Sequence, residues 1–180
     1  MRIISGKYKR RTFHPPGGLP VRPTTDFAKT GLFNILNNMV DLNGTTVLDL
    51  FAGTGNISFE FISRGAASVT AVDREKKCLE FIRTVKEKLD AQAIRTVRSD
   101  IYSFIERETG NYDIIFADPP FDMENKNDLA EMVLNSGLLK NEGIFILEHP
   151  EQEAYDNIPG FSSSRKYGNV TFSFFVLPLD

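Results

Sequence analysis

The chain has 180 residues, of which 41% are hydrophobic and 25% charged, an ordinary balance for one globular domain. Its single cysteine, Cys78, excludes an internal disulfide and favours a reducing compartment, so we expect a cytoplasmic protein. The sequence has no metal-ligand spacing of Cys or His and no apolar run long enough to span a bilayer. We therefore expect neither a metal cofactor nor a membrane partner.

The basic residues are concentrated before the first acid, Asp26, although the net charge is −3. The members of this segment that could contact phosphate are Arg2, Lys7, Lys9, Arg10, Arg11 and Arg22. Short apolar runs and a turn cluster at 15–18 predict a small basic hairpin or extended arm over residues 1–23, beside a main domain over residues 24–180. On charge alone, a solvated terminus explains this segment equally well.

A helix over residues 25–40 follows, with Thr24 or Thr25 as its N-cap. Strand and helix patterns then alternate: strands are expected at 45–51, 68–73, 94–99, 112–118 and 143–149, with helices after the glycine turn at 52–55 and at 75–89, 101–107 and 128–135. Two last strand-like runs, 161–167 and 170–177, are separated by the hairpin turn signal Gly168-Asn169. This order predicts an α/β fold with a mostly parallel, doubly wound, seven-stranded sheet and a C-terminal antiparallel hairpin.

The turn after the first strand carries two glycines, which allow the backbone to approach a ligand closely. A nicotinamide-binding fingerprint would have a third glycine where this chain has Ser58. Asp49, in the strand just ahead, would repel a pyrophosphate but suits a cationic amino-acid group, such as the methionine part of S-adenosylmethionine. We therefore assign Asp49, Phe51, Gly53 and Gly55 to an S-adenosylmethionine site. A tight turn without a ligand is the alternative.

Two further acids follow the second and third strands. The spacing of Asp73 after the glycine turn fits a carboxylate that accepts both ribose hydroxyls, although dinucleotide enzymes place an acid there too. Asp100 would reach the same edge of the sheet beside the adenine, and it could equally be the N-cap of the helix at 101–107. We assign Asp73, Arg74, Asp100 and Ile101 to the cofactor site, from which S-adenosylhomocysteine would leave as product.

The fourth strand ends at Asp118-Pro119-Pro120-Phe121, because neither proline can donate a hydrogen bond to a sheet. Ligands of open α/β sheets bind at this edge. Carbonyl oxygens left unpaired at the prolines and the Asp118 carboxylate could accept the hydrogens of an exocyclic amine, while Phe121 stacks on the ring that carries it. These residues predict methyl transfer to a base amine by positioning and electrostatics. An ordinary Pro-Pro loop is the alternative.

Several segments also match one known family, and together they cover nearly the whole chain. They are residues 1–8 (MRIISGKY), 22–26 (RPTTD), 32–36 (LFNIL), 47–55 (VLDLFAGTG), 71–73 (AVD) and 118–121 (DPPF). On these segments the chain resembles the bacterial small-subunit ribosomal RNA guanine-N2 methyltransferases, the 16S rRNA (guanine(966)-N(2))-methyltransferase family. The first two segments point to this family in particular, since many amino-methyltransferases share the later motifs.

The resemblance implies a Rossmann-like class I methyltransferase domain with S-adenosylmethionine as donor and an N-terminal hairpin that grips RNA. It also implies a guanine N2 of ribosomal RNA, in small subunits that are assembled or assembling, as acceptor. Residues Arg22 to Thr25 would border the acceptor site, and Thr24 is counted with the basic residues as a contact to RNA. We expect the protein to be a monomer. The chain departs from the family at 27–31 (FAKTG), where a basic residue and then Arg-Glu are usual after Asp26. If those side chains shape the pocket or touch RNA, part of that contact is missing here.

Three other functions fit part of the pattern. A DNA adenine-N6 methyltransferase would use the same Asp-Pro-Pro-Phe segment, but no residues remain for a separate target-recognition region. A non-catalytic RNA-binding or assembly protein could retain the cofactor fold, although the intact segment argues against it. A nicotinamide-dependent dehydrogenase fits least well, because of Asp49 and Ser58.

Overall fold

The computed structural model describes residues 1–19, 24–124 and 126–177. Its elements are α1 (Asp26–Met39), β1 (Thr46–Leu50), α2 (Asn56–Ser63), β2 (Ser68–Asp73), α3 (Lys76–Leu89), β3 (Ile94–Arg98), α4 (Ile101–Arg107), β4 (Tyr112–Ala117), α5 (Lys126–Asn135), β5 (Leu139–Pro150), β6 (Phe161–Tyr167) and β7 (Val170–Val176). The seven strands form one sheet in the order β3-β2-β1-β4-β5-β7-β6. Strands β1 to β5 are parallel, and β7 is antiparallel to both of its neighbours. The predicted fold class and C-terminal hairpin are confirmed.

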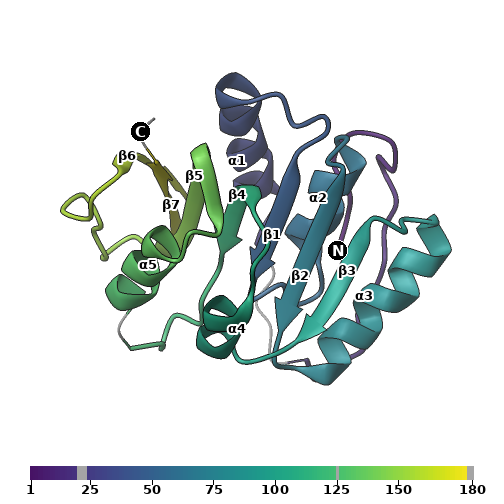
Figure 1. The fold of residues 1–180 in the computed structure, drawn as a ribbon. Coiled ribbons are helices and arrows are strands. Elements are labelled where there is room, and N and C mark those ends of the chain that lie inside the picture. Colours follow the sequence, from purple (N-terminus) through teal and green to yellow (C-terminus); the bar gives the residue numbers. More distant parts are fainter. Residues whose placement is uncertain (20–23, 125, 178–180) are drawn as a thin grey trace.

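The central strands are apolar on both faces because helices cover both of them. On one face, Val47 and Phe116 pack in the same cluster as apolar side chains of α1, α2 and α3. On the other face, Leu48 and Ile115 pack with side chains of α4 and α5. Figure 1 shows the sheet lying between these helices, with the arrowheads of β1 and β2 pointing toward the edge where α4 begins. The strand ends, rather than the strand faces, are therefore where a ligand can approach.

Most predicted elements are confirmed, with differences of a few residues at their ends. β4 ends at Ala117, so both prolines lie just beyond the sheet as expected. β5 begins at Leu139 rather than at Gly143. Leu139 pairs with Tyr112, but the register then shifts so that Ile144 pairs with Ile114. Residues inserted at such an irregularity interrupt the apolar periodicity, which is why the sequence pattern missed this part of the strand.

The N-terminal segment forms a small hairpin that packs against the main domain. A bridge joins Arg2 to Thr12, and the amide of Ile3 donates to the carbonyl of Arg11 at 2.9 Å. The side chains of Ile3 and Tyr8 are buried in the same cluster as α1 and α2. The hairpin is thus fixed by the core of the main domain, while the division at residue 23 stays a prediction.

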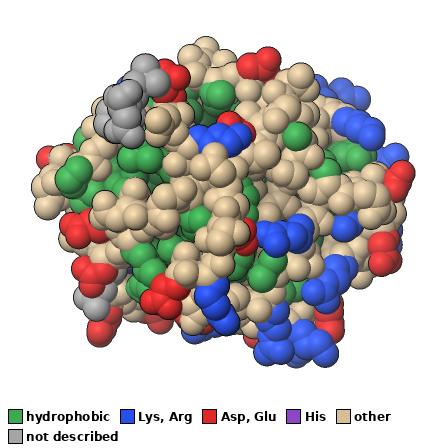
Figure 2. Space-filling view, viewed as in Figure 1, with side chains coloured by type: hydrophobic (Ala, Val, Ile, Leu, Met, Phe, Trp, Pro, Cys, Tyr) green, Lys and Arg blue, Asp and Glu red, His purple; other side chains and the backbone are tan. Residues whose placement is uncertain are grey.

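Charged side chains are distributed unevenly over the surface. Figure 2 shows Lys and Arg side chains gathered over the side of the molecule where β3 and α3 lie in Figure 1. The exposed basic residues of these elements include Lys76, Arg83 and Arg95. Within the described part of the chain, no helix is long and apolar enough to cross a membrane.

Candidate functional site

A cleft of about 1000 Å³ opens at the carboxyl ends of the parallel strands. One group of lining residues, here called the glycine side, includes Asp49, 51–54, Ile57, 73–75 and 100–102. A second group, here called the proline side, includes Thr24, Thr25, Phe27, 118–123, Glu148 and 167–170. Every residue predicted to bind the cofactor or to act in catalysis lines this cleft except Gly55, which belongs to the same turn as Gly53. The fold has therefore brought the separately predicted motifs into one site.

The turn on the glycine side has a backbone conformation that few residues adopt. Phe51, Gly53 and Gly55 have φ angles of 62°, 52° and 75°, in the left-handed region. A Cβ on Gly55 would lie 3.0 Å from side-chain carbons of α2 and α3, so only glycine fits without displacing them. Phe51 is not a glycine, and its conformation is strained. Strain of this kind is concentrated at ligand-binding turns.

Asp49 is almost completely buried beneath the cleft, at 1% exposure. Burial raises the pKa of its carboxyl to about 7, partly offset by a hydrogen bond donated by the Ser58 hydroxyl, while the negative charge of Asp73 acts in the same direction as burial. A cationic ligand in the cleft would stabilise the ionised carboxylate. The sulfonium and ammonium groups of S-adenosylmethionine meet that requirement, and a pyrophosphate does not.

The two other predicted acids also hold the glycine side together. The Asp73 carboxylate accepts hydrogen bonds from the amides of Gly53 and Glu75, both at 2.8 Å. Each carboxylate oxygen can accept a second hydrogen bond, so capacity for ribose hydroxyls is left. Asp100 accepts from the amide of Ser103 at 3.2 Å and thus caps α4 while lining the cleft. Its predicted N-cap role is confirmed; its contact with adenine stays a prediction.

On the proline side, the Asp-Pro-Pro-Phe turn differs from the sequence prediction in one respect. The carbonyl oxygen of Pro120 accepts a hydrogen bond from the amide of Met123 at 2.9 Å. The sequence predicts carbonyl oxygens left unpaired by the prolines, but the carbonyl oxygen of Pro120 is paired, because the chain turns back at once after Phe121. The remaining candidate acceptors for an amine are the Asp118 carboxylate and the Pro119 carbonyl, while Phe121, 38% exposed, offers its ring to the cleft.

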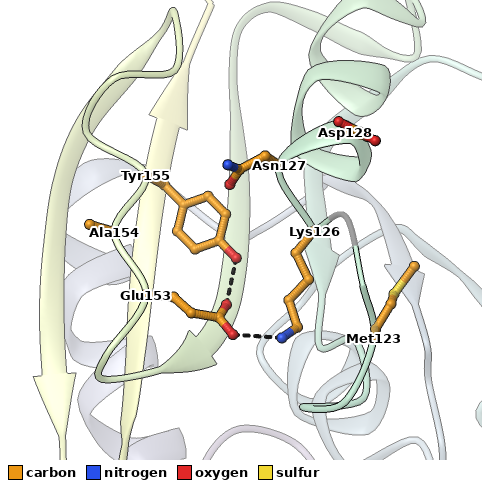
Figure 3. Close-up of a pocket in the computed structure, with 7 residues that line it drawn as sticks. All are labelled: Met123, Lys126, Asn127, Asp128, Glu153, Ala154 and Tyr155. Carbon is orange, nitrogen blue, oxygen red and sulfur yellow. Dashed lines mark hydrogen bonds and ion pairs between the residues drawn. The ribbon is translucent and has the colours of Figure 1, made fainter.

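A buried lysine supports this turn from outside the cleft. Lys126 Nζ donates to the carbonyl oxygen of Phe121 at 2.8 Å and to Glu153 Oε1 at 2.6 Å. The other oxygen of Glu153 accepts from the Tyr155 hydroxyl at 2.6 Å. Figure 3 shows these side chains lining a smaller pocket of about 460 Å³ between α5 and the segment that follows β5. We interpret this network as structural, because Lys126 links Glu153 to the Phe121 carbonyl.

Sequence reasoning missed Glu148. This residue is 3% exposed at the end of β5, lines the proline side, and accepts a hydrogen bond from Thr24 Oγ1 at 2.9 Å. The available signal was an acid near the end of an apolar strand beside the strand that carries Asp118. Thr24, predicted to contact RNA, thus also orients an acid of the cleft.

Two aromatic residues lie at the entrance to the proline side. Phe27, 68% exposed, packs edge-on against Tyr167 with 5.7 Å between ring centroids. A Cβ on Gly31 would lie 2.1 Å from Tyr167 Cε1, so the glycine allows the Tyr167 ring to rest on α1. Phe27, which stands where the family pattern has a basic residue, therefore makes an aromatic contact instead.

Lys29, also in that segment, is buried in a polar network that attaches the N-terminal hairpin. Its ammonium group donates to the Arg2 carbonyl at 2.5 Å and to Asn56 Oδ1 at 2.8 Å, and it lies 3.5 Å from Glu60 Oε2. Glu60 in turn accepts from the hairpin amides of Ile4 and Ser5. Burial lowers the pKa of Lys29, and the negative charge of Glu60 opposes that effect.

Among the described residues, the basic side chains predicted to contact RNA are not part of the cleft lining. The exposed members are Arg2, Lys7, Lys9, Arg10 and Arg11. Arg2 forms an ion pair at 2.9 Å with Asp26, in the first turn of the helix whose start borders the proline side. Arg22 lies outside the described residues. In the described ranges, no group of three or more His, Cys, Asp and Glu residues could hold a metal ion.

Solved structures identify the class of protein that this fold and cleft define. The Escherichia coli protein yhhF superposes with a TM-score of 0.86 at 26% identity, covering 100% of this chain and 99% of that chain. The T. thermophilus 16S rRNA N2 G1207 methyltransferase (RsmC), solved with AdoMet and guanosine, superposes with a TM-score of 0.75 at 23% identity, over 96% of this chain and 49% of that chain. At that identity the second likeness shows the fold alone. The fold is that of the class I S-adenosylmethionine-dependent methyltransferases.

Sequence comparisons identify the family. The chain belongs to the family described as Conserved hypothetical protein 95, whose profile matches residues 1–176. It is 30% identical over 148 residues to the ribosomal RNA small subunit methyltransferase D of Buchnera aphidicola subsp. Baizongia pistaciae, covering 82% of this chain and 75% of that protein. It is 28% identical over 159 residues to the protein of that name in Escherichia coli K12, covering 88% and 79%. The family resemblance predicted from sequence is confirmed.

Proposed function

We propose that this protein transfers a methyl group from S-adenosylmethionine to the N2 amine of a guanine in small-subunit ribosomal RNA. The observation that carries the proposal is the single cleft in which the glycine side and the Asp-Pro-Pro-Phe turn face the same space. The ribosomal RNA methyltransferases among its relatives support the substrate class.

The glycine side holds the donor in this proposal. Asp49 and Asp73 would bind its cationic amino-acid part and its ribose, and Asp100 with Ile101 would border the adenine. When bound, S-adenosylmethionine supplies an electrophilic methyl group on sulfur and leaves as S-adenosylhomocysteine. The buried Asp49 and the rigid turn orient that group by preorganised electrostatics, which requires no metal and no covalent enzyme intermediate.

The proline side holds the acceptor. An exocyclic amine is a poor nucleophile because its lone pair is delocalised into the ring. Hydrogen bonds from the amine to the Asp118 carboxylate and the Pro119 carbonyl favour a geometry in which the lone pair points toward the methyl group. Phe121 would stack on the base, which must leave its own stack to enter the cleft.

The N-terminal hairpin supplies affinity for RNA. Its exposed basic residues would bind phosphates with the salt dependence typical of such contacts, and RNA shape would select the target. The attachment of the hairpin to α1 and α2 supports this proposal, because basic residues held by the core would bind phosphate at a constant distance from the cleft. We expect the protein to act as a monomer on the small subunit or on an assembly intermediate.

Methylation assays test this proposal directly. Purified protein with S-adenosylmethionine should methylate small subunits from cells that lack the gene, and nucleoside mass spectrometry should identify N2-methylguanosine. Methylation of naked DNA at adenine N6 would contradict the proposal. Binding of the cofactor without methyl transfer to any RNA would instead support a non-catalytic assembly protein.

Asp118→Ala tests the role of the acceptor turn. We expect turnover to fall at least about 100-fold, because an electrostatic contact made to the reacting amine is lost. The affinity for S-adenosylhomocysteine, measured by calorimetry, should stay nearly unchanged, since Asp118 is assigned to the acceptor amine and not to the cofactor. Unchanged turnover in this variant would refute the role assigned to Asp118.

A further inference from the structure

Glu148 is a second acid beside the acceptor turn. Ala117 on β4 and Leu147 on β5 are partners in the parallel register, so Asp118 and Glu148 follow at neighbouring positions on adjacent strands. Adjacent strands lie about 4.8 Å apart, which brings both carboxylates to the same rim of the cleft. Both residues line the proline side, and Glu148 is only 3% exposed.

A chain of hydrogen bonds from α1 and α2 orients Glu148. Its Oε2 accepts from Thr24 Oγ1 at 2.9 Å, and the Thr24 carbonyl accepts from Asn56 Nδ2 at 3.0 Å. Asn56 Oδ1 accepts from the buried Lys29 ammonium group at 2.8 Å. Because a side chain held in this way loses little further freedom when a ligand arrives, Glu148 is preorganised to accept a hydrogen bond in the cleft.

The chemistry of the amino bases decides what such an acceptor selects. In guanine, the ring atom on one side of the N2 amine is N1, which carries a hydrogen. In adenine, the ring nitrogen beside the N6 amine is N1 without a hydrogen, and in cytosine N3 beside the N4 amine also lacks one. A carboxylate next to the amine position therefore meets a donor only in guanine and meets a lone pair in the other two.

We infer that Glu148 accepts the N1 hydrogen of guanine while Asp118 and Pro119 hold its amine, and that Glu148 thereby selects guanine over the other amino bases. This inference rests on the proposed function and deepens it. The Asp-Pro-Pro-Phe turn suits any exocyclic amine, so a separate group must distinguish the ring. Glu148 is a specificity-determining residue in this scheme, and Thr24 is a positioning residue that acts through it.

The test replaces guanine by a base whose N1 accepts a hydrogen bond where N1 of guanine donates one. 2-Aminopurine keeps the amine at C2, but it lacks O6 and its N1 is an acceptor, so the assignment of Glu148 is read from the change in preference between variant and wild type. Once the target guanine is mapped, a small-subunit RNA fragment is synthesised with guanine or 2-aminopurine at that position and assembled with small-subunit proteins. Glu148→Gln, wild type and the control Glu142→Gln are compared by kcat/KM on both. Glu142 is an exposed residue of the same strand, outside the cleft lining.

The wild type should prefer guanine by at least about 100-fold, as sites that hydrogen-bond a ring N–H do. Glu148→Gln should gain activity on 2-aminopurine, because its amide can donate to N1 of that base as well as accept from N1 of guanine, so that the preference for guanine falls at least about 100-fold. Glu142→Gln should behave as the wild type, and all three should bind S-adenosylhomocysteine equally, which shows that the cofactor side is intact.

Two results would separate the inference from the function on which it rests. If the wild type methylates guanine and Glu148→Gln keeps the same preference, or loses activity on both bases by the same factor, the assignment of Glu148 is wrong and the proposed function stands. If the wild type methylates adenine or no base at all, the proposed function fails and this inference fails with it.

Discussion

Replacing the buried acid beneath the cleft should change how stability depends on pH. Asp49 has an ordinary pKa of 3.8 when exposed, and burial raises it to about 7 in the folded protein. A group whose pKa is raised by folding contributes stability that is fully present below 3.8 and is lost as the pH rises through about 7. Asp49→Asn removes this titration while keeping an oxygen that can accept from the Ser58 hydroxyl.

The size of the effect follows from the two pKa values. The difference between 3.8 and about 7 corresponds to about 4 kcal/mol of unfolding free energy, at 1.36 kcal/mol for each pH unit. Roughly 3 kcal/mol of this falls between pH 5 and pH 8, because the unfolded acid is already ionised at pH 5. Relative to the wild type, Asp49→Asn should therefore be more stable at pH 8 than at pH 5 by about 3 kcal/mol.

Urea denaturation at several pH values measures this difference. All other groups titrate in both proteins, so subtraction isolates Asp49. Asp113→Asn is the matched control: burial acts to raise the pKa of Asp113, but hydrogen bonds from Lys140 and Thr46 and the charge of Lys140 lower it overall. Its stabilising effect is complete by pH 5, so the control difference should be flat from pH 5 to pH 8. A flat difference for Asp49→Asn would refute the argument that this buried acid is raised toward neutral pH.

Two further outcomes follow from the packing and charge of other elements. Gly31→Ala places a Cβ 2.1 Å from the Tyr167 ring, so the ring must move. We expect the free energy of unfolding, measured by urea denaturation, to fall by about 1–3 kcal/mol. An unchanged denaturation midpoint would show that the Tyr167 ring is not tightly packed against α1. Substitution of Lys7, Arg10 and Arg11 together by Ala should raise the apparent KM for RNA and reduce the salt dependence of that KM. The affinity for the cofactor should be unchanged, because these side chains are exposed and outside the cleft lining. An unaltered KM would show that the hairpin does not bind RNA. We substitute rather than delete this segment because Ile3 and Tyr8 belong to the core.

Several features of this protein were predictable because they depend on local sequence. Alternating strand and helix patterns determine a mostly parallel sheet, since parallel strands need crossover connections and those crossovers have one hand. The prolines after Ala117 end β4 wherever the strand lies, and Asp100 caps α4 through a neighbouring amide. The glycine turn and the Asp-Pro-Pro-Phe turn both follow parallel strands, so their meeting at one edge was predictable too.

Other features were decided by contacts between residues far apart in the chain. Sequence alone did not reveal that Lys29 is fully buried or that the Pro120 carbonyl accepts a hydrogen bond within its own turn. It also did not reveal that the ring of Tyr167 packs against Gly31. Glu148 reaches the cleft only because β5 lies next to β4 in a register that no local pattern specifies. Periodicity tells which face of an element is apolar, but the partner of a polar side chain, and hence the chemistry of the site, depends on how the elements pack.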